Sequence, residues 1–351
     1  MAEKILMKGN EAIGEAAIIA GCRYYFGYPI TPQSELTAYM AKKLLKMKDA
    51  AFVQSESELA AINMVYGAAS TGVRAMTSSS SPGISLMQEG ISYIACSEVP
   101  CVVINMMRGG PGLGDIQPAQ SDYFQATKGG GHGDYHLIVL APSSVQELVD
   151  LTMDAFDLAD KYRNPAMILG DGLLGQMMEA VEFKKKPKVD LPSKESWTLV
   201  GCKGRKPHQI VSFNLNPSVL EKMNLVINEK YKKLEEKEVR YEAISLENAD
   251  LVIVAYGTVA RIVKTVIQKA KKEGINVGLI RPITLYPFPE KIIGDTAEKI
   301  KKFLIVEMSL GQLIEDVRLA VNGKAKIKFY GRPGGIIPSP EEILEKVKKC
   351  L

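Results

Sequence analysis

The chain has 351 residues, a length that favours two domains over one. Its composition is that of an ordinary globular protein, with 46% hydrophobic and 24% charged residues and a net charge of +4. No basic block is interleaved with aromatic residues, so we expect no nucleic-acid surface. The five cysteines show no CxxC spacing, which argues against a disulfide framework and against a metal or iron–sulfur site on this chain. No apolar run is long enough to span a membrane, and a cytoplasmic location is expected.

The first domain is predicted over residues 1–181, where short apolar runs alternate with longer helical patterns. Strands are predicted at 24–28, 51–54, 73–78, 101–106, 137–140 and 166–169, with helices at 32–46, 58–70, 83–95 and 143–161. Alternation of this kind is typical of a parallel sheet that helices cover on both faces. The predicted fold class is therefore α/β.

The pattern weakens over residues 182–243, which we interpret as a linker or irregular insertion. Its charged stretch at 229–242 has the composition of a long solvent-exposed helix. From 244 to 351 the alternation resumes and predicts a second, smaller parallel-sheet domain. Its strands are expected at 251–256, 276–281, 303–307 and 326–330, and its helices at 258–273, 310–321 and 340–349.

Ligands of open parallel sheets gather beyond the carboxyl ends of the strands. The first predicted strand ends before Thr31 and Pro32, a pair that favours a helix N-cap and that can also hold a carboxylate. The second leads to Glu56 and Glu58 at a helix start, where acidic residues normally complement the helix dipole. Since the two point in nearly opposite directions, one at most faces the crevice. Glu58 precedes an apolar stretch, so its surroundings are expected to be dry enough for proton transfer.

The third and fourth predicted strands end in residues suited to ligand contact. A turn containing Ser80, Pro82 and Gly83 offers hydroxyl groups and a close backbone approach to a flat ligand. Arg108 follows the fourth strand, where it is either a surface residue or a bidentate clamp for a substrate carboxylate. The glycine-rich loop at 128–134 has the composition of a lid, and we expect structural hydrogen bonding of its His132 ahead of catalysis.

Gly170-Asp171-Gly172 looks like the start of the thiamine diphosphate–magnesium motif. That motif continues with an asparagine pair after a spacer, and no asparagine follows here at a suitable distance. We therefore interpret the segment as a strand-end turn. If thiamine diphosphate is involved, another chain must bind its metal and its phosphates.

The motifs taken together resemble the alpha subunit of the 2-oxoacid:ferredoxin oxidoreductases, most of all the 2-oxoisovalerate (3-methyl-2-oxobutanoate) branch. The matching pieces are GYPITPQSE, QSESELAAINMVYGAAS, TSSSSPGISLMQEG, NMMRGGPGLG, QSDYFQATKGGGHGDY, RPITLYPFP and VEMSLGQLIEDVR. The resemblance implies a thiamine-pyrimidine-binding (PYR-like) domain followed by a transketolase C-terminal-like domain. The implied reaction is oxidative decarboxylation of a 2-oxoacid with CoA to an acyl-CoA and CO2, with reduction of ferredoxin.

The resemblance also implies roles for single residues. Glu58 would contact the aminopyrimidine ring of thiamine diphosphate and act in catalysis, with Ser80, Pro82 and Gly83 beside the cofactor. Thr31 and Arg108 would hold the substrate carboxylate. A beta subunit would bind the magnesium and the diphosphate, and gamma- and delta-type subunits would complete the complex and carry the iron–sulfur clusters. Among the possible acids 2-oxoisovalerate is favoured, with 2-oxoglutarate next; Lys128 or His132 is then a candidate for a second carboxylate.

Two other interpretations stay open at this point. One is a self-contained thiamine enzyme similar to transketolase, which the missing phosphate motif disfavours. The other is a non-catalytic scaffold subunit in which Thr31, Glu58 and the serine turn are only helix caps.

Overall fold

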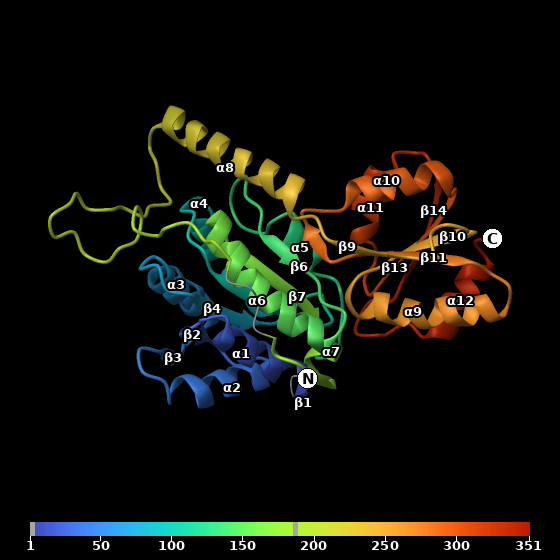
Figure 1. Cartoon of the computed structure of the whole chain (residues 1–351), viewed down its shortest axis with the longest axis horizontal. Helices are drawn as coiled ribbons and strands as arrows, with labels where there is room; N and C mark the ends of the chain where they lie inside the picture. The colour runs from blue at the N-terminus through green and yellow to red at the C-terminus, as the bar shows by residue number, and fades with distance from the viewer. Residues whose placement is uncertain (1–3, 185–188) are drawn as a thin grey trace.

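The computed structural model describes residues 4–184 and 189–351 and contains two α/β domains side by side (Figure 1). The first domain is built on a seven-stranded sheet with the order β12-β6-β7-β5-β4-β2-β3. Its own strands are β2 (Tyr24–Gly27), β3 (Ala51–Gln54), β4 (Ala75–Ser79), β5 (Val102–Met107), β6 (Ile138–Leu140) and β7 (Ala166–Asp171). Each of these six matches a predicted strand to within two residues, and all six run parallel.

Helices cover both faces of this sheet, as expected from the alternation. Successive residues of β5 point to opposite faces, so Val102 and Ile104 join one core while Val103 joins the other. The helices of the first domain are α1 (Gly9–Ile19), α2 (Ser34–Leu44), α3 (Glu58–Ala69), α4 (Ser81–Cys96), α5 (Tyr123–Thr127), α6 (Val145–Tyr162) and α7 (Gly172–Gln176). Buried residues of α3 and α4 pack on one face, and those of α1, α2 and α6 pack on the other.

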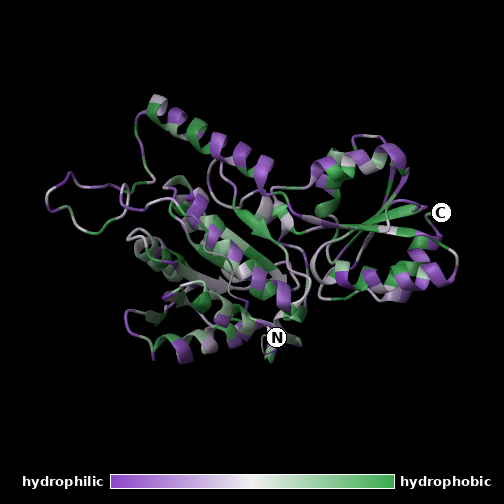
Figure 2. Ribbon diagram, in the orientation of Figure 1, coloured by the Kyte–Doolittle hydropathy of each residue, from purple (hydrophilic) through white to green (hydrophobic). Residues whose placement is uncertain are grey.

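The second domain has a five-stranded sheet with the order β14-β13-β10-β11-β9. Its strands are β9 (Tyr241–Ile244), β10 (Leu251–Val254), β11 (Val277–Pro282), β13 (Lys302–Glu307) and β14 (Lys326–Gly331), and its helices are α9 (Gly257–Lys272), α10 (Glu290–Lys299), α11 (Leu313–Val321) and α12 (Pro340–Lys348). The inner strands β10, β11 and β13 are mostly hydrophobic, while α9 and α12 combine hydrophobic residues with hydrophilic ones (Figure 2). The predicted α/β class is confirmed for both domains, with antiparallel strands added at the sheet edges.

In its described residues the region 182–243 contains one long helix, α8 (Pro217–Lys237). Before it, Trp197 and Thr198 are buried and Lys194 donates to the Gly72 carbonyl, while the chain between them and α8 forms a loop that projects from the first domain (Figure 1). The helix begins twelve residues before the charged stretch that predicted it. Asn216 caps its first turn through a hydrogen bond to the Ser218 amide, and Pro217 occupies the first helical position. Those two residues, and not the charge run, determine where the helix starts.

Several elements had no sequence prediction. β1 (Ile5–Lys8) and β8 (Met178–Val181) form a small antiparallel ribbon, and α1 follows β1 directly. β12 (Thr284–Tyr286) comes from the second half of the chain but pairs antiparallel with β6 at the edge of the first sheet. The predicted domain limits of 181 and 243 stay predictions.

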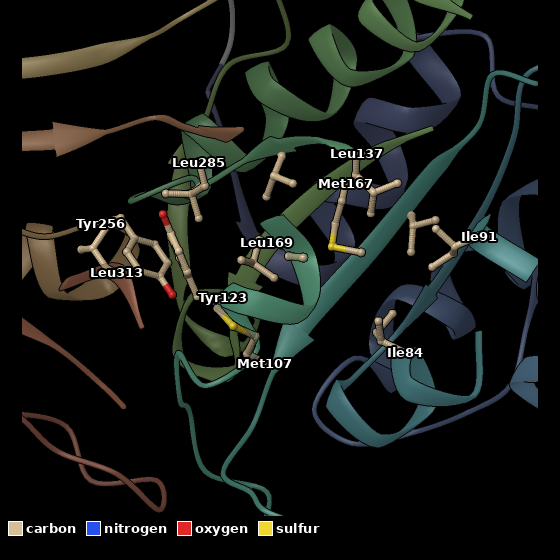
Figure 3. Packing of buried hydrophobic residues seen from close by; sticks show 14 of the residues in the cluster. Ile84, Ile91, Met107, Tyr123, Leu137, Met167, Leu169, Tyr256, Leu285 and Leu313 are labelled. Atoms are coloured by element: carbon tan, nitrogen blue, oxygen red, sulfur yellow. The ribbon is translucent and has the colours of Figure 1, made fainter. Parts of the chain in front are cut away.

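An ion pair and a shared core join the two domains. Arg281 on β11 is 2% exposed and forms a bidentate pair with Glu147 of α6, at 2.8 and 2.9 Å, and a third bond to Glu242 at 2.7 Å. Elsewhere between the domains, Tyr123 of α5 packs among Tyr256, Leu285 and other buried side chains that span both domains (Figure 3). The domains therefore meet through a buried ion pair and through shared hydrophobic packing.

Replacing Arg281 by Met is expected to destabilise the protein by about 3 kcal/mol, because two carboxylates lose the cation that holds them at a buried contact. Guanidinium denaturation measures this change. Lys324→Ala is the matched control, since it removes an exposed pair with Glu298 and should change stability little. Equal effects of the two substitutions would contradict the importance of the inter-domain pair.

Candidate functional site at the carboxyl edge of the large sheet

The four predicted strand ends lie next to one another, since β5, β4, β2 and β3 are neighbours in that order. The chain passes from β2 to β3 on one side and then returns to β4 on the other side of β2. Such a reversal leaves a crevice at the carboxyl edge of a parallel sheet. The segments bearing Thr31 and Ser80 leave the two strands that flank this reversal.

Glu58 is the first residue of α3 and is 5% exposed. Ser57 caps the helix by accepting a hydrogen bond from the Ala60 amide, which fixes the direction of the first turn. The Glu58 carboxylate accepts a hydrogen bond of 3.4 Å from the Ser79 hydroxyl. Glu56, two residues earlier, is exposed and bonds only locally with Ser57 among the described residues. The expected difference in burial between the two glutamates is confirmed.

The turn after β4 brings backbone close to this carboxylate. A Cβ atom on Gly83 would lie 2.0 Å from the Ser79 Oγ and 2.4 Å from the Glu58 Oε1, so a larger residue there requires one of these side chains to move. The hydroxyl of Ser80 is fully buried and has no hydrogen-bond partner in the described part of the chain. A buried carboxylate with spare acceptor capacity and an unpaired buried hydroxyl suit a flat heteroaromatic ring with hydrogen-bond donors.

Arg108 follows β5 and is 6% exposed. Its Nη1 donates to the Thr31 carbonyl at 2.9 Å and its Nη2 to the Leu113 carbonyl at 2.8 Å, while its buried Nε has no partner in residues 4–184 or 189–351. Within those same residues no carboxylate lies at ion-pair distance from it. A buried guanidinium without a counter-ion is costly unless an anion binds beside it.

Thr31 does not cap a helix, and that prediction is wrong. The helix α2 begins at Ser34 with Gln33 in the N-cap position, and the Thr31–Pro32 peptide bond is cis. Thr31 is exposed, and its hydroxyl makes no hydrogen bond within the described residues. Its loop is held instead through the Pro32 carbonyl, which accepts hydrogen bonds from Asn10 at 2.7 Å and Gln176 at 3.0 Å.

A buried polar network beneath this loop had no sequence prediction. The Ser78 hydroxyl lies 2.6 Å from the Gln33 Oε1, and the Tyr25 hydroxyl contacts both Ser78 at 2.7 Å and Thr37 at 2.9 Å. Burial raises the pKa of Tyr25 to about 12, so its proton remains available for these bonds. The network ties the start of α2 to β2 and β4. In the sequence, the polar Gln33 directly after Pro32 was the one indication that a buried polar network lies here.

The Gly170-Asp171-Gly172 segment is a strand-end turn, as interpreted from sequence. Asp171 ends β7 and its carboxylate accepts hydrogen bonds from the amides of Leu173 and Leu174. Burial raises the pKa of Asp171. In the described residues no three His, Cys, Asp or Glu side chains gather as a metal site would require. None of the described helices is both long and apolar enough to cross a membrane.

The glycine-rich loop at 128–134 packs on α4, where the Gly130 amide donates to Gln88. Lys128 pairs with Asp316 of α11, so its ammonium group already has a partner. His132 is exposed and forms no hydrogen bond within the described part of the chain, contrary to expectation. His136 takes the structural role instead, stacking on Tyr286 with ring centres 4.2 Å apart.

A cavity of about 930 Å³ lies away from the strand-end site, between the last turn of α8 and the second domain. Its lining includes His136, Tyr286, Phe288 and several charged residues. None of Thr31, Glu58, Ser80, Gly83 and Arg108 lines it. The strand-end residues therefore lie apart from this cavity.

Comparison with known proteins identifies the class of the molecule. Residues 15–242 match the family described as pyruvate flavodoxin/ferredoxin oxidoreductase, thiamine diphosphate-binding, and residues 249–343 match pyruvate:ferredoxin oxidoreductase core domain II. The chain belongs to the 2-oxoacid:ferredoxin oxidoreductase family as an alpha-type subunit. The resemblance predicted from the sequence motifs is confirmed.

Individual relatives match over the full length. Ketoisovalerate oxidoreductase subunit VorB of Methanothermobacter thermautotrophicus is 49% identical over 344 residues, which cover 98% of this chain and 97% of that one. The 2-oxoglutarate synthase subunit KorA of Methanothermobacter marburgensis is 38% identical and covers 99% of both chains.

Two solved structures have similar folds. The 2-oxoglutarate:ferredoxin oxidoreductase of Magnetococcus marinus, with 2-oxoglutarate, coenzyme A and succinyl-CoA bound, superposes with a TM-score of 0.89 at 29% identity. The match covers 99% of this chain and 65% of that one, so about a third of that chain has no counterpart here. A split-gene transketolase, an inactive β4 tetramer, gives a TM-score of 0.60 at 13% identity over 98% of both chains and shows a similar fold alone.

Gly83→Ala is expected to lower the melting temperature, because the new Cβ must displace Ser79 or the buried Glu58 carboxylate. Gly67→Ala is the matched control on the exposed side of α3, where no atom lies within 4 Å of the added Cβ. That substitution should raise stability slightly, by about 0.5–1 kcal/mol, since alanine favours the helix. A stability gain in both variants would show that Gly83 is not held against the carboxylate.

Proposed function

We propose that the chain is the alpha subunit of a thiamine diphosphate-dependent enzyme that converts a 2-oxoacid and CoA to an acyl-CoA and CO2 while reducing ferredoxin. 2-Oxoisovalerate is the favoured substrate and 2-oxoglutarate the next. The preference follows the relatives, since identity to the ketoisovalerate enzyme subunit is 49% and to the 2-oxoglutarate enzyme subunit 38% over comparable lengths.

One observation carries the proposal: a buried carboxylate at the start of α3 and a buried guanidinium after β5, uncompensated in the described residues, both lie at the carboxyl edge of the first sheet. Glu58 has acceptor capacity to spare, and Arg108 lacks a counter-ion in the described residues. A buried charge without a partner is rare in a purely structural site. The pair suits a reaction that needs a proton acceptor beside an anionic substrate.

Glu58 would bind the aminopyrimidine ring of thiamine diphosphate, with the Ser80 hydroxyl and the backbone of Pro82 and Gly83 beside the ring. When bound, the cofactor would supply the carbon nucleophile of the reaction, its thiazolium C2. The protein's part is to keep the Glu58 carboxylate dry and aimed at the ring. Ser79 orients that carboxylate, and Gly83 lets α4 start beside it without a Cβ that would displace it.

Arg108 would bind the substrate carboxylate through its free Nε and the remaining N–H groups of its guanidinium. Its bonds to the Thr31 and Leu113 carbonyls hold the guanidinium plane in place before the substrate arrives. The Thr31 hydroxyl, exposed and without a partner in the described residues, would add a hydrogen bond to the same carboxylate. Binding the carboxylate at a fixed point places the keto carbon for attack.

Other subunits would complete the enzyme. The Asp171 turn caps α7 and offers no phosphate site, so we assign the magnesium and the diphosphate to a beta subunit. Gamma- and delta-type subunits would carry the iron–sulfur clusters that pass electrons to ferredoxin. All five cysteines of this chain are free, which fits the reducing cytoplasm in which we place the complex.

Glu58→Gln is expected to lower kcat of the assembled complex at least about a hundredfold, because an amide cannot serve as a proton acceptor. Decarboxylation of 2-oxoisovalerate, measured as CO2 release, reports the effect. Glu56→Gln is the matched control and should keep normal activity, since Glu56 is exposed. Normal activity of the Glu58→Gln complex would instead favour a scaffold role for this chain. In a separate test, retention of thiamine diphosphate by the isolated chain would favour a self-contained transketolase-like enzyme.

Arg108→Met is expected to raise KM for the 2-oxoacid about a hundredfold, because the substrate carboxylate loses a charge-assisted hydrogen bond. The KM of the Arg108→Lys variant should lie between those of the wild type and of Arg108→Met, since lysine keeps the charge but not the planar geometry. Steady-state kinetics with 2-oxoisovalerate, 2-oxoglutarate and pyruvate measure the change and rank the substrates. KM for CoA serves as the internal control, and an equal rise in both constants would contradict the assignment.

A further inference from the structure

A closed hydrogen-bond network lies directly behind the candidate site. The Arg108 amide donates to the Ser81 Oγ at 3.0 Å, and the Ser81 hydroxyl donates to the Asp122 Oδ2 at 2.6 Å. The same Asp122 oxygen accepts the Asn105 amide group at 2.9 Å. Asn105 in turn accepts the Ser81 backbone amide at 3.2 Å. Three separate elements, the end of β5, the start of α4 and the start of α5, thus converge on one carboxylate.

Asp122 occupies an unusual place for a charged group. Its two partners at Oδ2 are neutral donors, and no cation lies at ion-pair distance within the described residues. Burial raises the pKa of Asp122, while the bonds from Ser81 and Asn105 lower it. A carboxylate kept in such surroundings orders its donors strongly, because each bond is charge-assisted.

The second domain holds Asp122 in position from the other side. Gln312, the residue before α11, donates through Nε2 to the Ser121 carbonyl at 2.6 Å and accepts the Phe124 amide at 2.8 Å. Tyr123 donates to Asp316 at 2.6 Å, and its ring is fully buried between the domains (Figure 3). Both neighbours of Asp122 in sequence are therefore fixed by contacts to α11 or to the residue preceding it.

We propose that Asp122 is a positioning residue that transmits the placement of the second domain to the substrate site. Through Ser81 it sets the backbone of Arg108 and the start of α4, where Ser80 and Gly83 lie. The role rests on the proposed function of Arg108. It gives the second domain an indirect part in substrate binding, through the contacts that hold Asp122.

The test uses the assembled complex with its partner subunits and measures KM and kcat for 2-oxoisovalerate and KM for CoA. Asp122→Ala is expected to raise KM for the 2-oxoacid about tenfold with little change in kcat or in KM for CoA. Asp122→Asn should recover most of the loss, because one amide oxygen can accept both donors. Gln312→Leu should shift KM in the same direction by a smaller factor.

A double-mutant cycle separates positioning from simple destabilisation. If Asp122 acts through Ser81, then Ser81→Ala and the double variant should each raise KM about as much as Asp122→Ala alone. Ser81→Ala also serves if the Asp122 variant does not fold. Gln125→Ala is the matched control, because it removes an exposed bond to Ser85 between the same two helices, keeps the bond from Ser85 to the Ser81 carbonyl and should leave KM unchanged.

Two outcomes overturn the inference while leaving the proposed function intact. One is normal KM in the Asp122→Ala complex under conditions where Glu58→Gln is inactive. The other is a double-mutant cycle in which the effects of the two substitutions add. A fall in kcat and in melting temperature together with a rise in KM for CoA would likewise mark a structural role only. An active Glu58→Gln complex would instead refute the proposed function itself.

Discussion

The site depends on the reversal of strand order between β2 and β4. Because the chain builds outward from β2 to β3 and then returns to the other side, the loops after these strands diverge and cannot cover the carboxyl edge. Glu58 reaches back across this gap from the helix after β3 to the turn after β4. A carboxylate, a serine turn and a guanidinium thereby meet although 50 residues separate Glu58 from Arg108.

Buried polar groups, rather than apolar contacts, give this edge its shape. Gln33, Ser78 and Tyr25 hold one side, while the Asp122 network holds the other. Hydrogen bonds in a dry environment demand specific geometry, and a group that loses its partner is costly to leave buried. The few atoms that remain unpaired, such as Arg108 Nε and Ser80 Oγ, then mark where a ligand is expected.

The parallel strands and most of their helices were predictable from sequence, because runs buried on both faces are continuous and apolar and the helices between them are amphipathic. Glu58, Gly83 and Arg108 were found because they follow such strands. The helix cap at Thr31 was mispredicted. The Thr-Pro pair favours a cap locally, but hydrogen bonds from the distant Asn10 and Gln176 to the Pro32 carbonyl hold this segment as a loop. Asp122 and Gln33 were missed because their partners lie far away in sequence, and no local pattern records such pairings.

The strand β12 has a consequence for how the chain is made. It pairs with β6 at the outer edge of the first sheet, yet it is synthesised only after about 280 residues of the chain. Until then the backbone groups of β6 stand open to pairing with another chain. The nascent protein therefore carries an unprotected edge for most of its synthesis, and a chain cut before residue 284 would keep it.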